Sequence, residues 1–108
     1  MKDTTRLLQD ILEAITTIES YAVASQNEFL EDEKTQDAIM FNLIIMGEAA
    51  NKIPPEFQEI HPEIPWSSII GTRNVIVHGY DQVKLQIVWD IIQKNLHPLK
   101  MTLSELVS

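Results

Sequence analysis

The chain has 108 residues, no cysteine and a formal net charge of −8 at pH 7. This length predicts one domain, and the lack of cysteine excludes disulfide scaffolds and thiolate metal sites. Only 8 residues are lysine or arginine, which argues against a protein that coats nucleic acid, because displaced counterions supply most of that affinity. An enzyme that holds one phosphodiester at one site stays open, as does a partner protein with a basic surface.

The N-terminal residues do not have the apolar stretch of a signal peptide. The longest apolar runs, such as residues 43–46, are far too short to span a membrane. We therefore expect a soluble cytoplasmic protein with no membrane partner.

The first predicted helix runs from Thr4 to about Tyr21. Apolar residues recur there at spacings of three and four, as in an amphipathic helix. These residues are Leu7, Leu8, Ile11, Leu12, Ile15 and Ile18. Asp3, Thr4 and Thr5 are the candidate N-caps.

A less regular stretch is predicted next. Residues 25–27 indicate a break, and residues 28–34 an acidic loop or a frayed helical turn. A second strong helix is predicted over residues 35–52, where the apolar stripe is broad. Such a helix is buried on more than one side, which suggests a dimer face. Pro54 and Pro55 end it.

Residues 56–65 are predicted to link this helix to the next, with one turn of helix at most. Trp66 opens the third helix, with Ser67 or Ser68 as its cap, and Gly79 marks its end or a bend. The β-branched residues of this segment would also allow a strand. We predict a helix, because no partner strand is evident.

The last helical region is predicted from Asp81 to about Val107, with a kink near Asn95 caused by Pro98. Together these elements predict an all-α fold, namely a four-helix bundle with an additional short helical element.

Polar side chains concentrate between Arg73 and Tyr80 in an otherwise apolar helix. Asn74 and His78 are four positions apart and share a helix face. Arg73 and Tyr80 also align if the helix persists through Gly79. Arg73 and His78 are five apart, so they point more than a quarter turn away from each other. Two copies of the helix, packed together, could bring them to one phosphate.

An arginine with a histidine suits RNA cleavage without metal, in which the 2′-OH is the nucleophile. A histidine can remove or return a proton near neutral pH. An arginine can grip the phosphate with two parallel hydrogen bonds and stabilise its growing charge. On spacing alone, a structural salt bridge or a cap carries equal weight. His78 before Gly79 could also simply end a helix, where a protonated histidine favours the macrodipole.

The motif and its surroundings resemble those of HepT-like toxins in the HEPN superfamily. Arg73-x4-His78-x-Tyr80, with Asn74 directly after the arginine, is similar to the R-x4-H-x-Y motif of that family. The resemblance covers nearly the whole chain. It includes the segments 41–49 around Gly47-Glu48-Ala49, 64–66, 71–74, 88–89 and 96–99.

This resemblance implies a single HEPN-like helical domain over residues 1–108 that dimerises through its motif helices. It implies a metal-independent endoribonuclease toxin without a cofactor, which cleaves RNA and not DNA at a composite site of Arg73 and His78. It also implies a type VII-like toxin–antitoxin pair. The partner would be a nucleotidyltransferase antitoxin of the MntA type, which adds AMP to Tyr80 and so blocks the site.

Two further residues are supporting candidates. Glu48 could support the site across the bundle, or it could pair with Lys52 four residues on. Asn74 could orient His78, contact RNA or only hydrogen-bond a neighbouring helix. No metal site is expected, because the three histidines do not have the spacing of a ligand set.

Two other functions stay open. A non-catalytic helical module that binds a nucleotidyltransferase and presents its nucleotide or substrate fits the acidic charge. A plain structural dimerisation bundle leaves the polar cluster unexplained. The complete set of Arg73, His78 and Tyr80 favours the enzyme, because a scaffold has no need of it.

Overall fold

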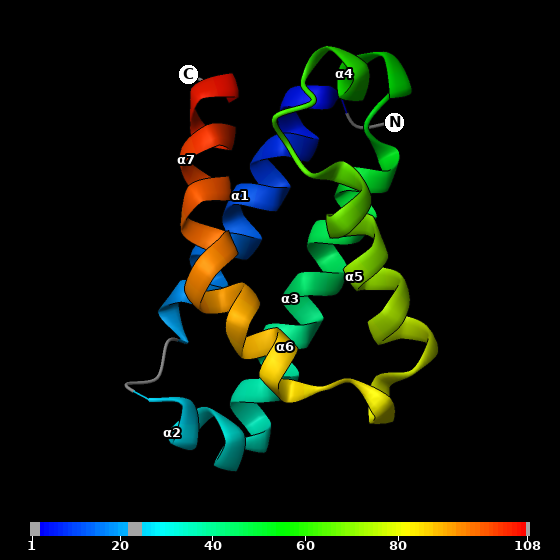
Figure 1. The fold of residues 1–108 in the computed structure, drawn as a ribbon. Helices are drawn as coiled ribbons and strands as arrows, with labels where there is room; N and C mark the ends of the chain where they lie inside the picture. Colours follow the sequence, from blue (N-terminus) through cyan, green and yellow to red (C-terminus); the bar gives the residue numbers. More distant parts are fainter. Residues whose placement is uncertain (1–2, 22–24, 108) are drawn as a thin grey trace.

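Four helical segments run alternately down and up through the molecule (Figure 1). The computed structural model describes residues 3–21 and 25–107, and it contains no strand within those ranges. The four segments are α1 (Thr4–Ser20), α3 (Glu33–Lys52), α5 (Trp66–His78) and a final one made of α6 (Leu85–Asp90), the π-helical turn η2 (Ile91–Asn95) and α7 (Leu96–Val107). Shorter elements are α2 (Gln26–Glu31), α4 (Pro55–Ile60) and the 3₁₀ turn η1 (Tyr80–Gln82). The predicted all-α fold is confirmed.

Helix α3 lies at the centre of this arrangement. It packs against α1 on one side and α5 on the other, and α7 packs against α1 (Figure 1). The apolar stripes meet in one core, whose burial is the main favourable term in folding. Its most buried members include Ile11, Ile15, Ile18, Phe29, Ile39, Ile53, Ile64, Ile76, Leu96 and Leu103.

Helix α1 follows the prediction closely. Among the three candidate caps, Asp3 is the one that accepts a hydrogen bond from the Arg6 backbone N–H, at 2.8 Å. The predicted apolar stripe faces the core, where Ile11 and Ile15 are fully buried. Local periodicity was sufficient here because one face of the helix is apolar and the other is polar.

The acidic stretch after α1 is more ordered than expected. Residues 26–31 form helix α2, and the Ser25 hydroxyl caps it by accepting from the Glu28 N–H at 3.2 Å. Phe29 is fully buried and its ring lies 5.6 Å from that of Trp89. Asp32 then caps α3. Two caps and one buried ring hold a segment whose charge had indicated a loop or a frayed turn.

Helix α5 is confirmed as a helix and begins at Trp66 as predicted, but the predicted serine cap is wrong. It begins at Trp66 directly after Pro65, with no side-chain cap from Ser67 or Ser68. The Trp66 indole N–H instead donates to the His61 carbonyl at 3.0 Å and anchors this end.

The other end of α5 lies at Gly79, one of the two predicted outcomes, so the condition for aligning Arg73 with Tyr80 is not met. The helix ends at His78, and Gly79 takes the C-cap position. Tyr80 therefore lies in η1, beyond the helix, and does not share a helical face with Arg73.

Pro98 disturbs the last segment near Asn95, as predicted. Residues 91–95 form a π-helical turn in which the Leu96 N–H donates to the Ile91 carbonyl, five residues back. A proline inside a helix has no N–H and crowds the preceding turn, and a wider turn relieves that crowding. Among the described residues, no helix is both long and apolar enough to cross a membrane.

Candidate active site

Helices α3 and α5 approach each other closely at Gly47. A Cβ atom placed there would lie 2.1 Å from the Cβ and 2.8 Å from the Cγ of Arg73. It would also lie 3.1 Å from the Ile69 carbonyl oxygen. Only glycine fits at this point, so the Arg73 side chain starts directly against the backbone of α3.

The Arg73 guanidinium is held by neighbours on both helices. Its Nη1 donates to the Asn74 side-chain oxygen at 2.9 Å, and its Nη2 lies 3.9 Å from the Glu48 carboxylate. Its Nε is buried and has no hydrogen-bond partner among the described residues. The side chain is 31% exposed, and an arginine has five N–H donors. Donors therefore stay available to an anion that arrives from solvent.

Of the two roles considered for Glu48, the geometry favours support of Arg73. The carboxylate faces Arg73 across the two helices, and no ion pair joins it to Lys52 within the part of the chain that the structure describes. Asn74 likewise contacts Arg73, a partner outside its three predicted roles, which were to orient His78, to contact RNA or to hydrogen-bond a neighbouring helix. Both candidates thus contact the arginine.

A cavity of about 370 Å³ opens beside this cluster. Arg73, Asn74 and Glu48 line it together with Ile70, Asn51 and Lys52. Asn51 and Lys52 were missed as site residues, although they lie three and four positions after Glu48 and so share its side of α3. Its two cationic side chains outnumber the single Glu48 carboxylate, and two amides add hydrogen-bond donors, so the cavity could accept a phosphate.

His78 lies apart from the arginine cluster. It is exposed at the end of α5, and it makes no hydrogen bond or ion pair with the residues that the structure describes. Five positions on an α-helix correspond to a rotation of about 140° between Arg73 and His78. One chain therefore does not bring the two candidate catalytic residues together.

The other two histidines have partners elsewhere. The Nδ1 of His61 lies 3.1 Å from the Glu63 carboxylate, and the Nδ1 of His97 lies 3.9 Å from that of Glu19. In residues 3–21 and 25–107, no group of three or more histidine, aspartate or glutamate side chains is arranged so that it could hold a metal ion.

The Tyr80 hydroxyl donates a hydrogen bond to the Asp37 carboxylate of α3. This bond, with partial desolvation and the negative charges of Asp37 and Glu33, raises the pKa of Tyr80 from 10.0 to about 12. The side chain is still 46% exposed. The sequence alone does not point to Asp37, because 43 residues separate it from Tyr80 and no local pattern joins them.

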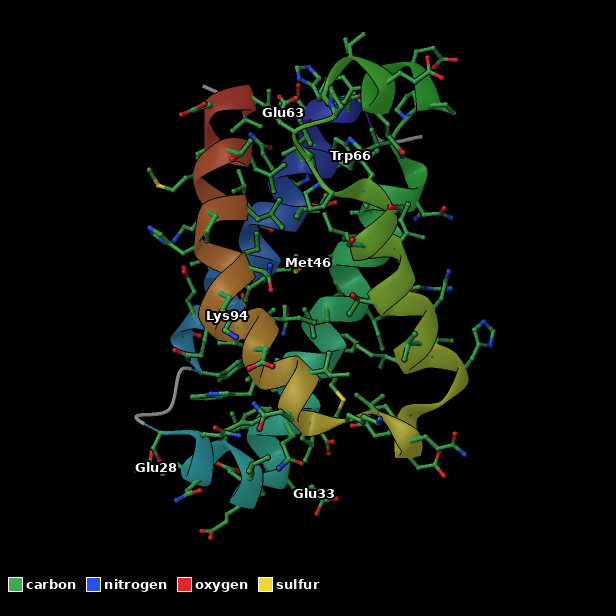
Figure 2. The ribbon with its side chains drawn as sticks, viewed as in Figure 1. Glu28, Glu33, Met46, Glu63, Trp66 and Lys94 are labelled. Carbon is green, nitrogen blue, oxygen red and sulfur yellow. The ribbon has the colours of Figure 1, made fainter. Side chains whose placement is uncertain are left out.

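A second cavity, of about 420 Å³, lies on the other side of α5 and is bounded by η2 and α7. Met46 of α3, Glu63 and Lys94 are among its lining residues, and Figure 2 shows Glu63 above and Lys94 below Met46. None of Arg73, His78 and Tyr80 lines this cavity. It is therefore separate from the candidate active site.

Comparison with known families decides the assignment. Residues 11–106, which are nearly the whole chain, match the family described as ribonuclease HepT-like. The chain belongs to the ribonuclease HepT-like family. The expected ribonuclease class and the expected family are confirmed.

Individual relatives agree with this assignment. A probable ribonuclease HepT of Thermococcus cleftensis is 38% identical over 94 residues, which are 86% of each chain. A putative RNase of Methanocaldococcus jannaschii is 35% identical over 84% of this chain and 76% of its own length. A putative RNase of Caldanaerobacter subterraneus subsp. tengcongensis is 33% identical over 99% of this chain and 96% of its own length. No solved structure matches the chain.

Proposed function

We propose that this ribonuclease cleaves RNA without metal, at a composite site that two copies of the chain form together. The observation that carries the proposal is that Arg73 and His78 of one chain do not lie together. Arg73 lines a cavity of about 370 Å³ between α3 and α5, whereas His78 points elsewhere and is unpartnered among the described residues. A histidine from a second copy would complete the site.

In this mechanism Arg73 binds the non-bridging oxygens of the scissile phosphate, and Lys52 adds a second positive charge. The 2′-oxygen attacks the phosphorus and the bond to the 5′-oxygen breaks. His78 removes the 2′-hydroxyl proton or supplies a proton to the departing 5′-oxygen. The products are a 2′,3′-cyclic phosphate and a free 5′-hydroxyl. Glu48 and Asn74 keep the guanidinium oriented.

An exposed apolar surface supports association through α3 and α5. Phe41 is 61% exposed and Val77 is 44% exposed. Phe41 lies on α3 between Asp37 and Glu48. Val77 lies on α5, after Arg73 and before Tyr80 of η1. Since Asp37 contacts Tyr80 and Glu48 faces Arg73, both apolar residues lie along the same helix pair. We infer that Phe41 and Val77 belong to one contiguous apolar patch, which is the kind of exposure typical of an interaction surface.

Phe41→Glu is expected to convert the dimer to a monomer and to abolish RNA cleavage, because a charge would be buried at the interface. Sedimentation velocity and a cleavage assay measure the two effects. Met101→Glu is the matched control, because Met101 is 56% exposed but lies on α7, away from this surface. A Phe41→Glu dimer that still cleaves RNA would rule out this interface.

We further propose that the chain is the toxin of a toxin–antitoxin pair in the cytoplasm. Its partner would be a nucleotidyltransferase of the MntA type, which adds AMP to Tyr80. The exposure of the Tyr80 ring supports this, because a modifying enzyme must reach its hydroxyl. The added phosphodiester and adenosine would bring negative charge and bulk that obstruct RNA.

The experiment that tests the nuclease is cleavage of single-stranded RNA in EDTA. The unmodified chain is expected to cut RNA, to leave 2′,3′-cyclic phosphate ends and to spare both DNA and 2′-O-methyl RNA of the same sequence. Cleavage of DNA, or a strict need for divalent cations, would contradict the mechanism. No cleavage by a chain whose Tyr80 is unmodified by mass spectrometry would favour a non-catalytic partner of a nucleotidyltransferase, which the net charge of −8 also suits.

A further inference from the structure

Tyr80 and Asp37 form a contact between two parts of the chain that are distant in sequence. Tyr80 is in η1, just after α5 ends, and Asp37 is near the start of α3. The hydroxyl donates to one carboxylate oxygen of Asp37. Both side chains are exposed, so a second protein could reach the hydroxyl and the carboxylate together.

The surroundings of the phenol make it a weak nucleophile. Glu33, one turn before Asp37, lies at the lower end of α3 (Figure 2). Its charge acts with that of Asp37 to disfavour the phenolate, and the pKa of Tyr80 is raised to about 12. At neutral pH almost every molecule therefore carries a protonated hydroxyl. A reaction at this oxygen needs a base that takes the proton as the new bond forms.

We propose that Asp37 is the catalytic base for nucleotidyl transfer to Tyr80. The Tyr80 oxygen attacks the α-phosphate of a nucleoside triphosphate and forms a new P–O bond. The bond between the α-phosphorus and the bridging oxygen to the β-phosphate breaks, and pyrophosphate leaves with that electron pair. The phenolic proton passes to the carboxylate oxygen of Asp37 that already accepts its hydrogen bond. This inference rests on the proposed modification of Tyr80.

The carboxylate is well suited to this task because no movement is needed before proton transfer. Donor and acceptor are already hydrogen-bonded in the unmodified chain. Asp37 thus belongs to the substrate of the modification, and the modifying enzyme need not supply a base of its own. Holding the Tyr80 hydroxyl and taking its proton are separate roles, because an asparagine at position 37 can accept the hydrogen bond but cannot take the proton.

The test compares rates of AMP transfer from ATP by a purified nucleotidyltransferase of the MntA type, followed by intact-mass and peptide mass spectrometry. Asp37→Asn is expected to slow the modification of Tyr80 by about 10²–10⁴-fold, the usual contribution of a general base. Glu33→Gln removes a charge of the same sign one turn away and is expected to stay close to the wild-type rate. Tyr80→Phe is the blank.

The outcomes distinguish the two proposals. Modification of Asp37→Asn at the wild-type rate overturns the role of Asp37 and leaves the modification of Tyr80 intact. A wild-type chain that gains no AMP on Tyr80 overturns the proposed modification, and the base falls with it.

A second measurement tests the contact without any partner. In a Tyr21→Phe background, NMR of the tyrosine ring carbon reports the Tyr80 pKa alone. The midpoint is expected near 12, and Asp37→Ala is expected to return it toward 10. Because the folded-state pKa is the higher one, the contact stabilises the fold below pH 10 and loses that contribution as the pH rises through about 12. Equal midpoints in both chains would overturn the inference.

Discussion

His78→Ala is expected to lower the rate of RNA cleavage by about 10²–10⁴-fold while the helical fold and its stability are retained. The histidine is exposed and makes no hydrogen bond or ion pair with the described residues, so its loss removes proton transfer and little packing. His97→Ala is the matched control, because His97 is exposed on α7, where it faces Glu19. Single-turnover cleavage and circular dichroism measure the two properties. Full activity in His78→Ala would exclude this residue from the reaction.

Mixed dimers sharpen this test. Arg73→Ala and His78→Ala homodimers are each expected to be inactive. A dimer of one with the other has one site that has lost both residues and one site with both intact, if each site takes its arginine and histidine from different chains. Coexpression of the two variants is therefore expected to restore part of the cleavage. If each site were built within one chain, every site in the mixed dimer would be defective and no activity would return.

Gly47→Ala is expected to destabilise the chain by about 1–3 kcal/mol, as overpacking of a close contact does. Alanine gains about 1 kcal/mol in helix propensity over glycine, but here the new Cβ would stand 2.1 Å from that of Arg73. The carbonyl of Ile69 is also close, so the two helices must separate. Urea unfolding measures the effect, and cleavage is expected to fall because Arg73 moves with α5.

Gly71→Ala is the control for this substitution. It changes the same residue type in α5, yet no atom outside its own helical turns lies within 4 Å of the added Cβ. Its stability is expected to be unchanged or higher by up to about 1 kcal/mol. If Gly47→Ala were as stable as Gly71→Ala, the close approach of α3 and α5 would be wrong.

The parts of the fold that sequence alone predicted are those governed by local rules. The stripe around Ile11 and Ile15 was enough to define α1, and Pro98 located the irregularity near Asn95. The short helix α2 was predicted only as a loop or a frayed helical turn, because its stability depends on the burial of Phe29 against a ring from α6. Tertiary packing of that kind overrides the acidic composition of the segment.

In the candidate site, too, the sequence predicted the local features but not the contacts between distant residues. The motif from Arg73 to Tyr80 is contiguous in sequence, so it could be found without a structure. The partners of its side chains could not, because Asp37 meets Tyr80 only when α3 and η1 are placed side by side. Local spacing offered Lys52 as one alternative for Glu48, whereas the packing of two helices turns that carboxylate toward Arg73.

The π-helical turn between α6 and α7 gives the chain one residue of spare length at that point. A π-helical turn is an α-helix with one residue added, and removal of one residue from 91–95 would return the segment to regular α-helix. Because the turn absorbs the added residue locally, the helices on either side of it would keep their phase after such a deletion. Leu99 and Leu103 would therefore stay buried against the bundle. A deletion in the middle of α1 has no such turn to absorb it, and the residues that follow within that helix would rotate by about 100° about the helix axis.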